Sequence, residues 1–586
     1  MIRHQCLASG FSAAFATIIA AGGLATNLQA QAFGQPCGGS GGPSTIQVQP
    51  GMRPGFTSTV QIDHLPPNQA AVLLVGTSRD QWGGTPLPLS LHGLGMPGCE
   101  LLVGPELMLT FATGGGTVAS SFQTPLSPSL AARWLHWQVM FAQPGLNAVN
   151  TGFSRGLSTR IAPLPTATTL VSSITQYGIT FQFQAPVPAG QFINGDWFVV
   201  GPAVLVAMTP PCVTVNGRVM HGAMINPIAA TKAHGYDKAL YGPGNEALYS
   251  DALNVAMGLA PSAPRTLQPN QSLIKVISNQ NTAFVPHIET CAVLTVLAEA
   301  PPQGSFRPPY AGTDHTVRYD DRMIDWTQLR ALPPATGLPD VAGILAKLQR
   351  CWLDHAPGWP SRYMHPVLNM PDYGRDFASL YNEASLLCHV NIPFVDKREL
   401  TLRLVQIGID FHGNVQNGCY WEGVGGHGSG RKWPILFTGA LLRDASMLAV
   451  GANYPSVRNL NGTYTAHFGE DCQTFYVQQT SATQVNWGFG GYDFADIGTP
   501  EFGFSHVHWP SSDAEGWTAN SYRRCCTANA WIGAVLGARM MGLVDEWSHP
   551  ALFDYTDRYA QIEPVGWTRS WAPWVGRMWD IYRPIY

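Results

Sequence analysis

Residues 369–387, NMPDYGRDFASLYNEASLL, and residues 419–437, CYWEGVGGHGSGRKWPILF, carry most of the information about the C-terminal half of the chain. Each stretch places polar and aromatic residues directly before an apolar run with helical spacing. The second stretch has five glycines, which allow a backbone to approach a ligand closely. A solvated loop normally has more Ser, Asn and Asp and fewer aromatic residues. The pattern therefore predicts a binding or catalytic loop between two helices.

Helical spacing continues on both sides of these stretches. In residues 399–411 the apolar residues cover more than one face, which is typical of a helix buried on two sides. Helices joined by short polar loops, without intervening strands, predict a toroid of helical hairpins over residues 320–586, with its loops gathered at one rim. The predicted helices cover residues 341–348, 377–390, 399–411, 435–450 and 528–543.

The N-terminal half has a different pattern of short β-segments separated by Gly and Pro clusters. Residues 33–161 predict an immunoglobulin-like or jelly-roll β-sandwich, whose role we interpret as binding or spacing. Residues 162–300 predict a second β-sandwich, and the Pro-rich residues 301–319 a linker. The predicted strands cover residues 45–48, 59–62, 71–75, 107–111, 137–141, 168–174, 179–184, 198–207, 272–277 and 292–297.

Composition excludes several classes of protein. Of the 586 residues, 45% are hydrophobic and 12% are charged, so the chain is globular and not disordered. The formal net charge is −4, without a long run of Lys or Arg, so nucleic acid is not an expected partner. The 18 tryptophans are consistent with sugar binding, because aromatic faces stack on the apolar faces of sugar rings.

The first 32 residues predict an export signal. A short basic start precedes an apolar, Ala-rich run, and Ala30-Gln31-Ala32 fits the rule of small residues at a cleavage site. No later stretch has the roughly 18 apolar residues that a membrane-spanning helix needs. We therefore expect a secreted or periplasmic protein.

Ten cysteines follow the predicted signal, and an oxidising compartment favours pairing of some of them. The natural pairs within a domain are Cys37 with Cys99 and Cys212 with Cys291, although sequence does not determine connectivity. The adjacent Cys525 and Cys526 are interpreted as small buried apolar residues.

The order of modules and three loops together resemble a known group of enzymes. The loops are residues 371–376 (PDYGRD), 425–434 (GGHGSGRKWP) and 517–526 (WTANSYRRCC). With β-modules preceding a helical region, they resemble exported polysaccharide lyases and glycosidases built on an (α/α) toroid. The resemblance covers the architecture of residues 162–586 and no catalytic signature residue by residue. It implies an acidic polysaccharide or oligosaccharide as the substrate.

Toroid lyases use Asn, Arg, His and Tyr to neutralise the sugar carboxylate, remove the C5 proton and protonate the leaving oxygen. This chain offers the same residue types in the three loops. The predicted catalytic residues are His427, Tyr373, Tyr522 and Asn369. The predicted substrate-binding residues are Arg375, Arg431, Lys432, Trp421, Tyr420, Arg523 and Arg524.

Hydrolysis is the alternative, and it needs two carboxyl groups on opposite sides of the glycosidic bond. The candidate carboxylates are Asp372, Asp376, Glu422 and Glu501. Asp376 also fits the first turn of a helix, where an acid interacts well with the helix dipole. Asp372 is close enough in sequence to Arg375 for an ion pair. These structural alternatives favour elimination over hydrolysis.

The sequence leaves further interpretations open. A lone histidine such as His427 commonly packs in a core. A non-catalytic carbohydrate-binding surface protein would also fit the N-terminal sandwich. His506 and His508 alternate as neighbours on one strand face do, which makes them weak candidates for a metal site. The sequence requires no cofactor, and it leaves a structural divalent cation open.

Overall fold

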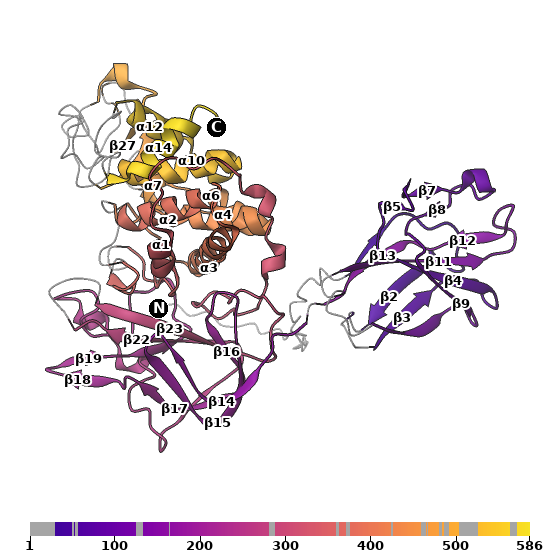
Figure 1. Ribbon diagram of the computed structural model, residues 1–586, viewed down its shortest axis with the longest axis horizontal. Coiled ribbons are helices and arrows are strands. Elements are labelled where there is room, and N and C mark those ends of the chain that lie inside the picture. Colours follow the sequence, from indigo (N-terminus) through magenta and orange to yellow (C-terminus); the bar gives the residue numbers. More distant parts are fainter. Residues whose placement is uncertain are drawn as a thin grey trace, which may run out of the picture. The chain divides into compact units, whose positions relative to one another are not determined.

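The computed structural model describes most of the chain after the predicted leader. The described residues are 30–49, 52, 57–124, 130, 133–162, 164–280, 287–358, 363–370, 375–423, 426–458, 464–465, 467–479, 483, 485, 492–502, 526–562 and 571–586. The chain divides into two compact units, residues 1–164 and 165–586. The N-terminal half is rich in strands and the C-terminal half in helices (Figure 1).

Unit 1 is a sandwich of two antiparallel sheets. Side chains from both sheets, including Ile62, Val75, Trp137 and Phe141, share one core, because alternate residues of each strand point to the same side. The three-stranded sheet has the order β10 (Val118–Gln123), β3 (Thr57–Asp63), β2 (Thr45–Gln49). The six-stranded sheet has the order β1 (Ala30–Phe33), β13 (Gly156–Arg160), β11 (Trp134–Ala142), β4 (Ala70–Gly76), β9 (Leu107–Ala112), with β12 (Thr151–Phe153) beside β11.

A long connection covers part of the outer face of the six-stranded sheet. It contains β5 (Gln81–Trp82), β6 (Thr85–Pro86), β7 (Leu89–Ser90) and β8 (Glu100–Leu101). The disulfide between Cys37 and Cys99 joins this connection to the start of the unit. The predicted Cys37–Cys99 pair is therefore confirmed.

Unit 2 begins with one eight-stranded sheet, where the sequence predicted a second pair of facing sheets. All the neighbours in the sheet are antiparallel except β16 and β23. The order is β20 (Ala223–Ile225), β22 (Gln271–Ser278), β23 (Ile288–Leu297), β16 (Trp197–Val200), β15 (Ile179–Gln191), β17 (Ala203–Thr209), β21 (Arg265–Leu267), with β14 (Thr169–Gln176) beside β15. A separate hairpin pairs β18 (Val213–Val215) with β19 (Arg218–Met220).

Both faces of this sheet are buried, which explains the continuous apolar runs of its central strands. On β23, Val293 packs into the core that includes the helices, whereas the next residue, Leu294, packs into the core on the other face. That second core also contains side chains of β15 and β17, so the sheet curls over its own outer face.

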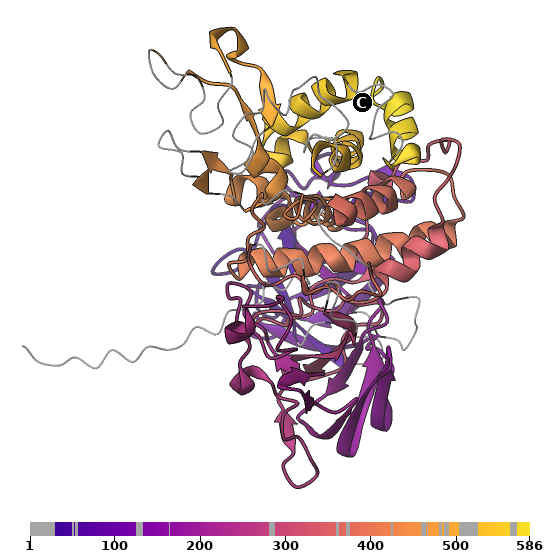
Figure 2. The same ribbon diagram turned by 90° about the vertical axis from the view of Figure 1, so that its left-hand side faces the viewer.

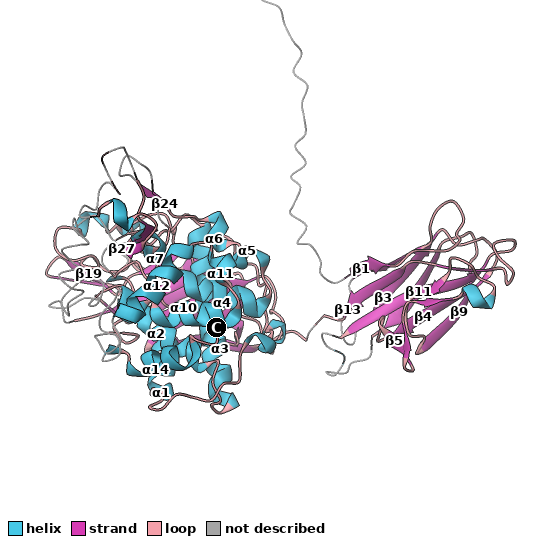
Figure 3. Cartoon of the chain, turned by 90° about the horizontal axis from the view of Figure 1, so that it is seen from above, coloured by secondary structure: helices cyan, strands magenta, loops and turns pink. Residues whose placement is uncertain are grey.

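The helices lie against one face of the sheet, with the long helix α3 nearest to it (Figures 1 and 2). Figure 3 shows the helices from above, covering the strands. The principal helices are α1 (Val341–Leu348), α2 (Arg375–Leu387), α3 (Phe394–Gln416), α4 (Lys432–Leu442), α10 (Ile532–Met541), α12 (Pro550–Ile562) and α14 (Pro573–Tyr582). Shorter ones are α5 (Ala445–Leu448), α6 (Val450–Asn453), α7 (Gly469–Gln473) and α11 (Val544–Trp547).

In the described part of the helical region, the strands occur as two small antiparallel hairpins. These pair β24 (Val457–Arg458) with β25 (Tyr464–Thr465) and β26 (Thr474–Tyr476) with β27 (Pro500–Phe502). Residues 301–319, which the sequence predicted as a linker, pack inside unit 2. Phe306, Arg307 and Tyr310 are almost fully buried, because the segment runs between the sheet and α3.

Candidate functional site

The glycine-rich loop between α3 and α4 is packed tightly against the protein's own backbone. A Cβ atom on Gly426 would lie 1.9 Å from the carbonyl oxygen of Cys526, and one on Gly428 would lie 2.1 Å from that of Glu422. Gly430 has a φ of +93° and lies against Ala378 of α2. These glycines are therefore required by packing, and close approach of a ligand is not needed to explain them.

The two cations at the end of this loop are buried in ion pairs. Arg431 is 0% exposed, and its Nε donates to Oδ2 of Asp354 at 2.8 Å. Lys432 donates to Oδ2 of Asp471 at 2.5 Å and to the carbonyl oxygen of Trp547. Burial lowers the pKa of Arg431, and the Asp354 carboxylate opposes that shift. Both predicted substrate-binding cations are thus neutralised inside the protein and not presented at a rim.

A second group of predicted residues is partly exposed beside the loop. Arg375 begins α2. Its backbone nitrogen lies 3.2 Å from the position that a Cβ atom would take on Gly426, the residue before His427. The Arg375 guanidinium lies 4.0 Å from the ring centre of Trp571 and 3.3 Å from Oδ1 of Asp376. The structure therefore brings together the two stretches that the sequence singled out, about fifty residues apart.

Tyr420 and Glu422 lie on the same loop, and both are partly exposed. The amide of Gly358 donates to the carbonyl oxygen of Tyr420 at 3.3 Å. A Cβ on Gly358 would lie 2.9 Å from Oε1 of Glu422, so residues 351–358 form another side of this region. Burial raises the pKa of Tyr420, and the Glu422 carboxylate adds to the shift. The phenol therefore stays protonated at neutral pH.

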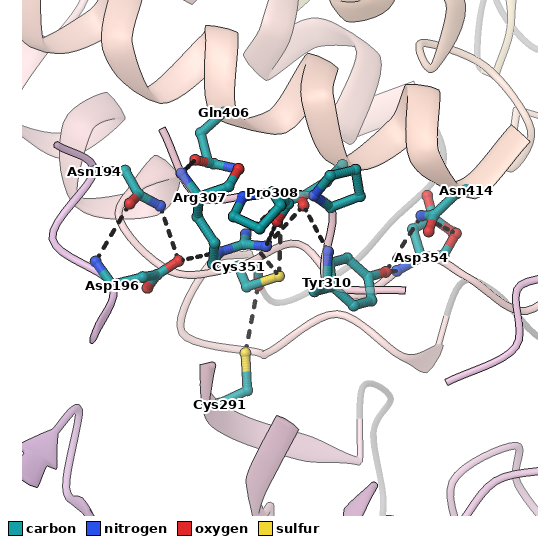
Figure 4. Close-up of polar contacts among 12 residues, drawn as sticks. Asn194, Asp196, Cys291, Arg307, Pro308, Tyr310, Cys351, Asp354, Gln406 and Asn414 are labelled. Atoms are coloured by element: carbon teal, nitrogen blue, oxygen red, sulfur yellow. Dashed lines mark hydrogen bonds and ion pairs between the residues drawn. The ribbon is translucent and has the colours of Figure 1, made fainter. Parts of the chain in front are cut away.

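A network of buried polar groups, shown in Figure 4, is joined to the loop by the ion pair between Asp354 and Arg431. The amide of Asp354 donates to the hydroxyl of Tyr310 at 2.8 Å. The side-chain nitrogen of Asn414, on α3, donates to the Tyr310 hydroxyl at 3.3 Å and to the carbonyl oxygen of Asp354 at 3.2 Å. Because Asp354 also accepts from Arg431, these bonds hold the base of the loop in one position.

The network continues to the sheet through Arg307 (Figure 4). Its Nε donates to Oδ2 of Asp196 and its Nη2 to Oδ2 of Asp410, each at 2.6 Å. Burial raises the pKa of Asp410 to about 6, although the Arg307 guanidinium opposes the shift. The backbone of Arg307 exchanges two hydrogen bonds with the side chain of Gln406. Asp196 precedes β16 and Asp410 lies on α3, so Arg307 connects the two layers.

Several buried polar atoms around this network have no hydrogen-bond partner among the described residues. Such atoms are rare in folded proteins, and a concentration of them indicates a place for water or a polar ligand. These buried polar atoms without a described partner are Nε1 of Trp352, Nε1 of Trp421, the hydroxyl of Tyr381, Nε2 of His355, Oδ1 of Asn369, Oδ1 of Asn414 and Oε1 of Glu470.

Ring contacts connect the aromatic residues of the same region. They join Trp352 to Tyr381, Tyr381 to Phe411 and Phe411 to Trp421, with 6.2, 6.2 and 5.6 Å between the ring centroids.

Glu470 is a buried acid that sequence reasoning missed. Its Oε2 accepts from the amide of Gly430 at 3.1 Å, which places the carboxyl group directly beneath the loop. Burial, together with the neighbouring Asp471 carboxylate, raises the pKa of Glu470 to about 7. A carboxyl group that is half protonated near neutral pH is able both to donate and to accept a proton.

The other predicted site residues are distributed differently. Asn369 is buried, and its side-chain nitrogen donates to the carbonyl oxygen of Cys351 at 3.3 Å. Trp421 is buried in the helical core. Glu501, on β27, is buried in an ion pair with Arg558 of α12, which gives it a structural role. Seven predicted residues lie outside the described part of the chain, namely Asp372, Tyr373, His506, His508, Tyr522, Arg523 and Arg524.

The cysteines of unit 2 differ from our expectations. Cys212 and Cys291 are both free thiols, so the predicted pair between them is wrong. Cys291 points toward the helices and lies 3.5 Å from the carbonyl oxygen of Cys351. Cys526 is disulfide-bonded, which corrects its interpretation as a small apolar residue.

The described residues contain neither a metal-binding cluster nor a membrane-spanning helix. Within that part of the chain, no group of three or more His, Cys, Asp or Glu side chains is arranged to hold a metal ion. No helix among the same residues has the length and apolarity to cross a membrane.

The comparisons with known proteins do not assign the chain to a family. No family model matches the sequence, and no curated protein matches it. Among solved structures, the chain is similar to trypsin-activated alpha-2-macroglobulin from Escherichia coli, with 10% identity and a TM-score of 0.15. The match covers 91% of this chain and 39% of that one. With so low a TM-score, the likeness carries no argument about fold or function.

Proposed function

We propose that this protein is an exported polysaccharide lyase that cleaves a uronic-acid-containing polymer by β-elimination. The observation that supports the proposal best is the meeting of Arg375 and the His427 loop above a buried region with unpaired polar atoms. In the proposed architecture, the helices of residues 320–586 form a toroid, and this region is the end of its groove.

Each partly exposed side chain has a role in the proposed elimination. The Arg375 guanidinium neutralises the sugar carboxylate, which makes the C5 proton more acidic. His427 removes that proton as the general base, and a tyrosine protonates the leaving oxygen. Tyr420 is a described candidate for the acid, because its phenol stays protonated at neutral pH. Tyr373 and Tyr522 stay candidates from the sequence.

The buried groups would support this chemistry without touching the polymer backbone. Asp354 and Arg431 fix the end of the loop that carries His427. Glu470 holds the amide of Gly430 from below. Their arrangement keeps the base in place during turnover, and well-held catalytic groups cost little reorganisation energy when the proton moves.

Glycoside hydrolysis is a second candidate, favoured by a specific observation. Two carboxylates, Asp376 and Glu422, are partly exposed on the two segments that meet at Gly426. A glycosidase places two such groups on opposite sides of the scissile bond. The ion pair of Asp376 with Arg375 makes a structural role for Asp376 equally consistent.

One experiment distinguishes the candidates. The purified full chain is incubated with alginate, polygalacturonate, chondroitin and a neutral glucan, while ultraviolet absorbance and reducing ends are both recorded. A lyase gives absorbance from the unsaturated product on an acidic polymer. Reducing ends without that absorbance would indicate a hydrolase. No product on any polymer, together with measurable binding, would indicate a non-catalytic carbohydrate-binding protein.

A further inference from the structure

A cleft of about 670 Å³ lies on unit 1, and all its described lining residues belong to that unit. This volume is in the usual range for sites that hold a small ligand or a few sugar units. We call it the sheet cleft and define it by Ser78, Arg79, Arg133, Trp134, His136 and Ser158.

The floor of the sheet cleft follows from strand register. His136 on β11 lies directly opposite Ser158 on β13 and Gly76 on β4. Opposite residues of antiparallel strands point to the same face, so His136 and Ser158 form a polar row across the sheet. Their side chains are hydrogen-bonded, with Nδ1 of His136 2.8 Å from Oγ of Ser158. At Gly76 the row has no side chain, and the carbonyl oxygen of Gly104 and the carboxylate of Glu106 pack there instead, 2.0 and 2.7 Å from the position of a Cβ, so the floor ends at β4.

Trp134 forms one wall of the sheet cleft. It lies two residues before His136 on β11 and therefore projects from the same face of the sheet. Its side chain is 36% exposed, although it is large and apolar. An exposed indole beside a polar floor is suited to a sugar ring, whose two faces are apolar and whose edge carries hydroxyl groups.

The opposite wall is positively charged. Arg79 follows β4, and its guanidinium lies 5.3 Å from the ring centre of Phe33. Burial and the Arg79 charge together lower the pKa of His136, so Arg79 is close enough to influence the floor. Arg133 lines the cleft beside Trp134. Among the described lining residues Asp80 is the one acid, and the nearby Glu106 carboxylate joins it in opposing the effect of Arg79 on the pKa of His136. The balance of charge favours an anionic ligand.

We propose that the sheet cleft binds an anionic oligosaccharide, with Trp134 stacking on a sugar ring and Arg79 and Arg133 contacting its acidic groups. The residues that carry the argument all follow the predicted leader. The inference does not depend on the proposed function, because binding at unit 1 requires no chemistry in unit 2.

The test measures binding by calorimetry with the full chain in a His427→Ala background. The probes are oligogalacturonate, a sulfated chondroitin oligosaccharide and neutral cellohexaose. We expect binding of at least one acidic probe, weakened by added salt, and about tenfold weaker binding in Trp134→Ala and in Arg79→Ala. Which acidic probe binds more tightly will distinguish carboxylate from sulfate recognition.

Matched controls come from the same unit. Trp82 is 43% exposed on β5 and outside the cleft, so Trp82→Ala is expected to bind as the parent does. Arg155→Ala, also outside the lining, serves the same purpose for the cations. Unchanged binding in both cleft variants would overturn the proposal. So would the absence of binding to both acidic probes, or equally tight binding of cellohexaose.

Discussion

Arg431 shows how a single residue changes meaning between sequence and structure. In the sequence it stands in a polar, glycine-rich loop and suggests a cation that contacts substrate. In the structure its guanidinium is fully buried, paired with Asp354 and 4.4 Å from the ring centre of Phe377. In the folded protein, Arg431 therefore holds the loop to the helical core.

Replacing Arg431 by Ala is therefore expected to destabilise the protein. The change breaks the buried ion pair between Arg431 and Asp354, which typically costs about 3–5 kcal/mol of unfolding free energy. Arg443→Ala is the matched control, because Arg443 pairs with Asp325 but is 75% exposed, and its loss should cost less than about 1 kcal/mol. Urea unfolding of both variants provides the measurement. Equal stability of the two variants would contradict this account.

His427 carries the chemical part of the proposal. We expect His427→Ala to reduce kcat by about 10²–10⁴-fold, the usual contribution of a general base, with little change in thermal stability. His92→Ala, an exposed histidine of unit 1, is the control and should leave turnover unchanged. A His427→Ala variant that turns over at the normal rate would return His427 to a purely structural role.

Glu470 gives a prediction about pH. Its pKa is raised from the ordinary value of 4.5 to about 7 in the folded state, so between these values the folded protein binds more protons than the unfolded chain. The contribution of Glu470 to stability is therefore greatest below about pH 4.5 and is lost as pH rises toward 7. Glu470→Gln keeps an acceptor for the amide of Gly430 and removes the charge.

We expect Glu470→Gln to be more stable than the parent at pH 8, and we expect that advantage to shrink as pH falls to 5. Thermal unfolding of both proteins from pH 5 to 8 measures the difference in their stability. Other titrating groups, such as Asp410, are present in both proteins, so their contributions cancel in this difference. A constant difference between the two proteins from pH 5 to 8 would show that the Glu470 pKa is close to its ordinary value.

Among the elements, the loop between α3 and α4 depends on glycine at positions where packing leaves no room. Gly428→Ala places a Cβ 2.1 Å from the carbonyl oxygen of Glu422, so we expect lower stability and loss of any activity that needs His427. Gly115→Ala, where nothing lies within 4 Å, should be nearly neutral. Differential scanning calorimetry of the two variants tests this. A fully stable and active Gly428→Ala protein would mean that the loop shifts easily.

Periodicity located many elements, and breaks in backbone geometry explain where it failed. Residues 341–348 form α1 as expected, because their apolar spacing is helical. The predicted helix 435–450 ends at Leu442, because Arg443 adopts a φ of 52° and the Asp444 side chain caps the next short helix. The predicted strand 198–207 is divided into β16 and β17 by Gly201-Pro202. Helices α12 and α14 were not predicted, although each begins with a proline, a typical first helical residue.

The candidate site was predictable only in part, for a physical reason. The composition of two separate stretches suggested Arg375 and His427, and the structure places Arg375 beside Gly426, the residue before His427. Asp354 is a single acid in apolar surroundings and Glu470 is one of two adjacent acids, and the importance of both follows from burial, which a local pattern does not reveal. A charged residue within an apolar run, such as Asp354 in CWLDHAP, was the available signal, since a buried charge needs a partner.

At the scale of the whole molecule, the chain consists of two compact units with separate cores. Compact units with their own cores commonly unfold as separate cooperative transitions. The described disulfide of unit 1 joins Cys37 to Cys99, 62 residues apart, and unit 2 has its own set of buried free thiols. Reduction is not a clean test, because Cys526 in unit 2 is also disulfide-bonded.

Replacing Cys37 and Cys99 together by Ser should therefore affect unit 1 alone. Closing a loop of this length stabilises a domain by about 4 kcal/mol, which corresponds to a fall of roughly 10–20 °C in the unfolding temperature of unit 1. The transition of unit 2 should stay where it is. Cys212→Ser is the matched control, because Cys212 is a free thiol whose sulfur accepts a hydrogen bond from Asn254, a role that a serine hydroxyl retains. Calorimetry in which both transitions fall together in the double variant would show that the two units unfold as one.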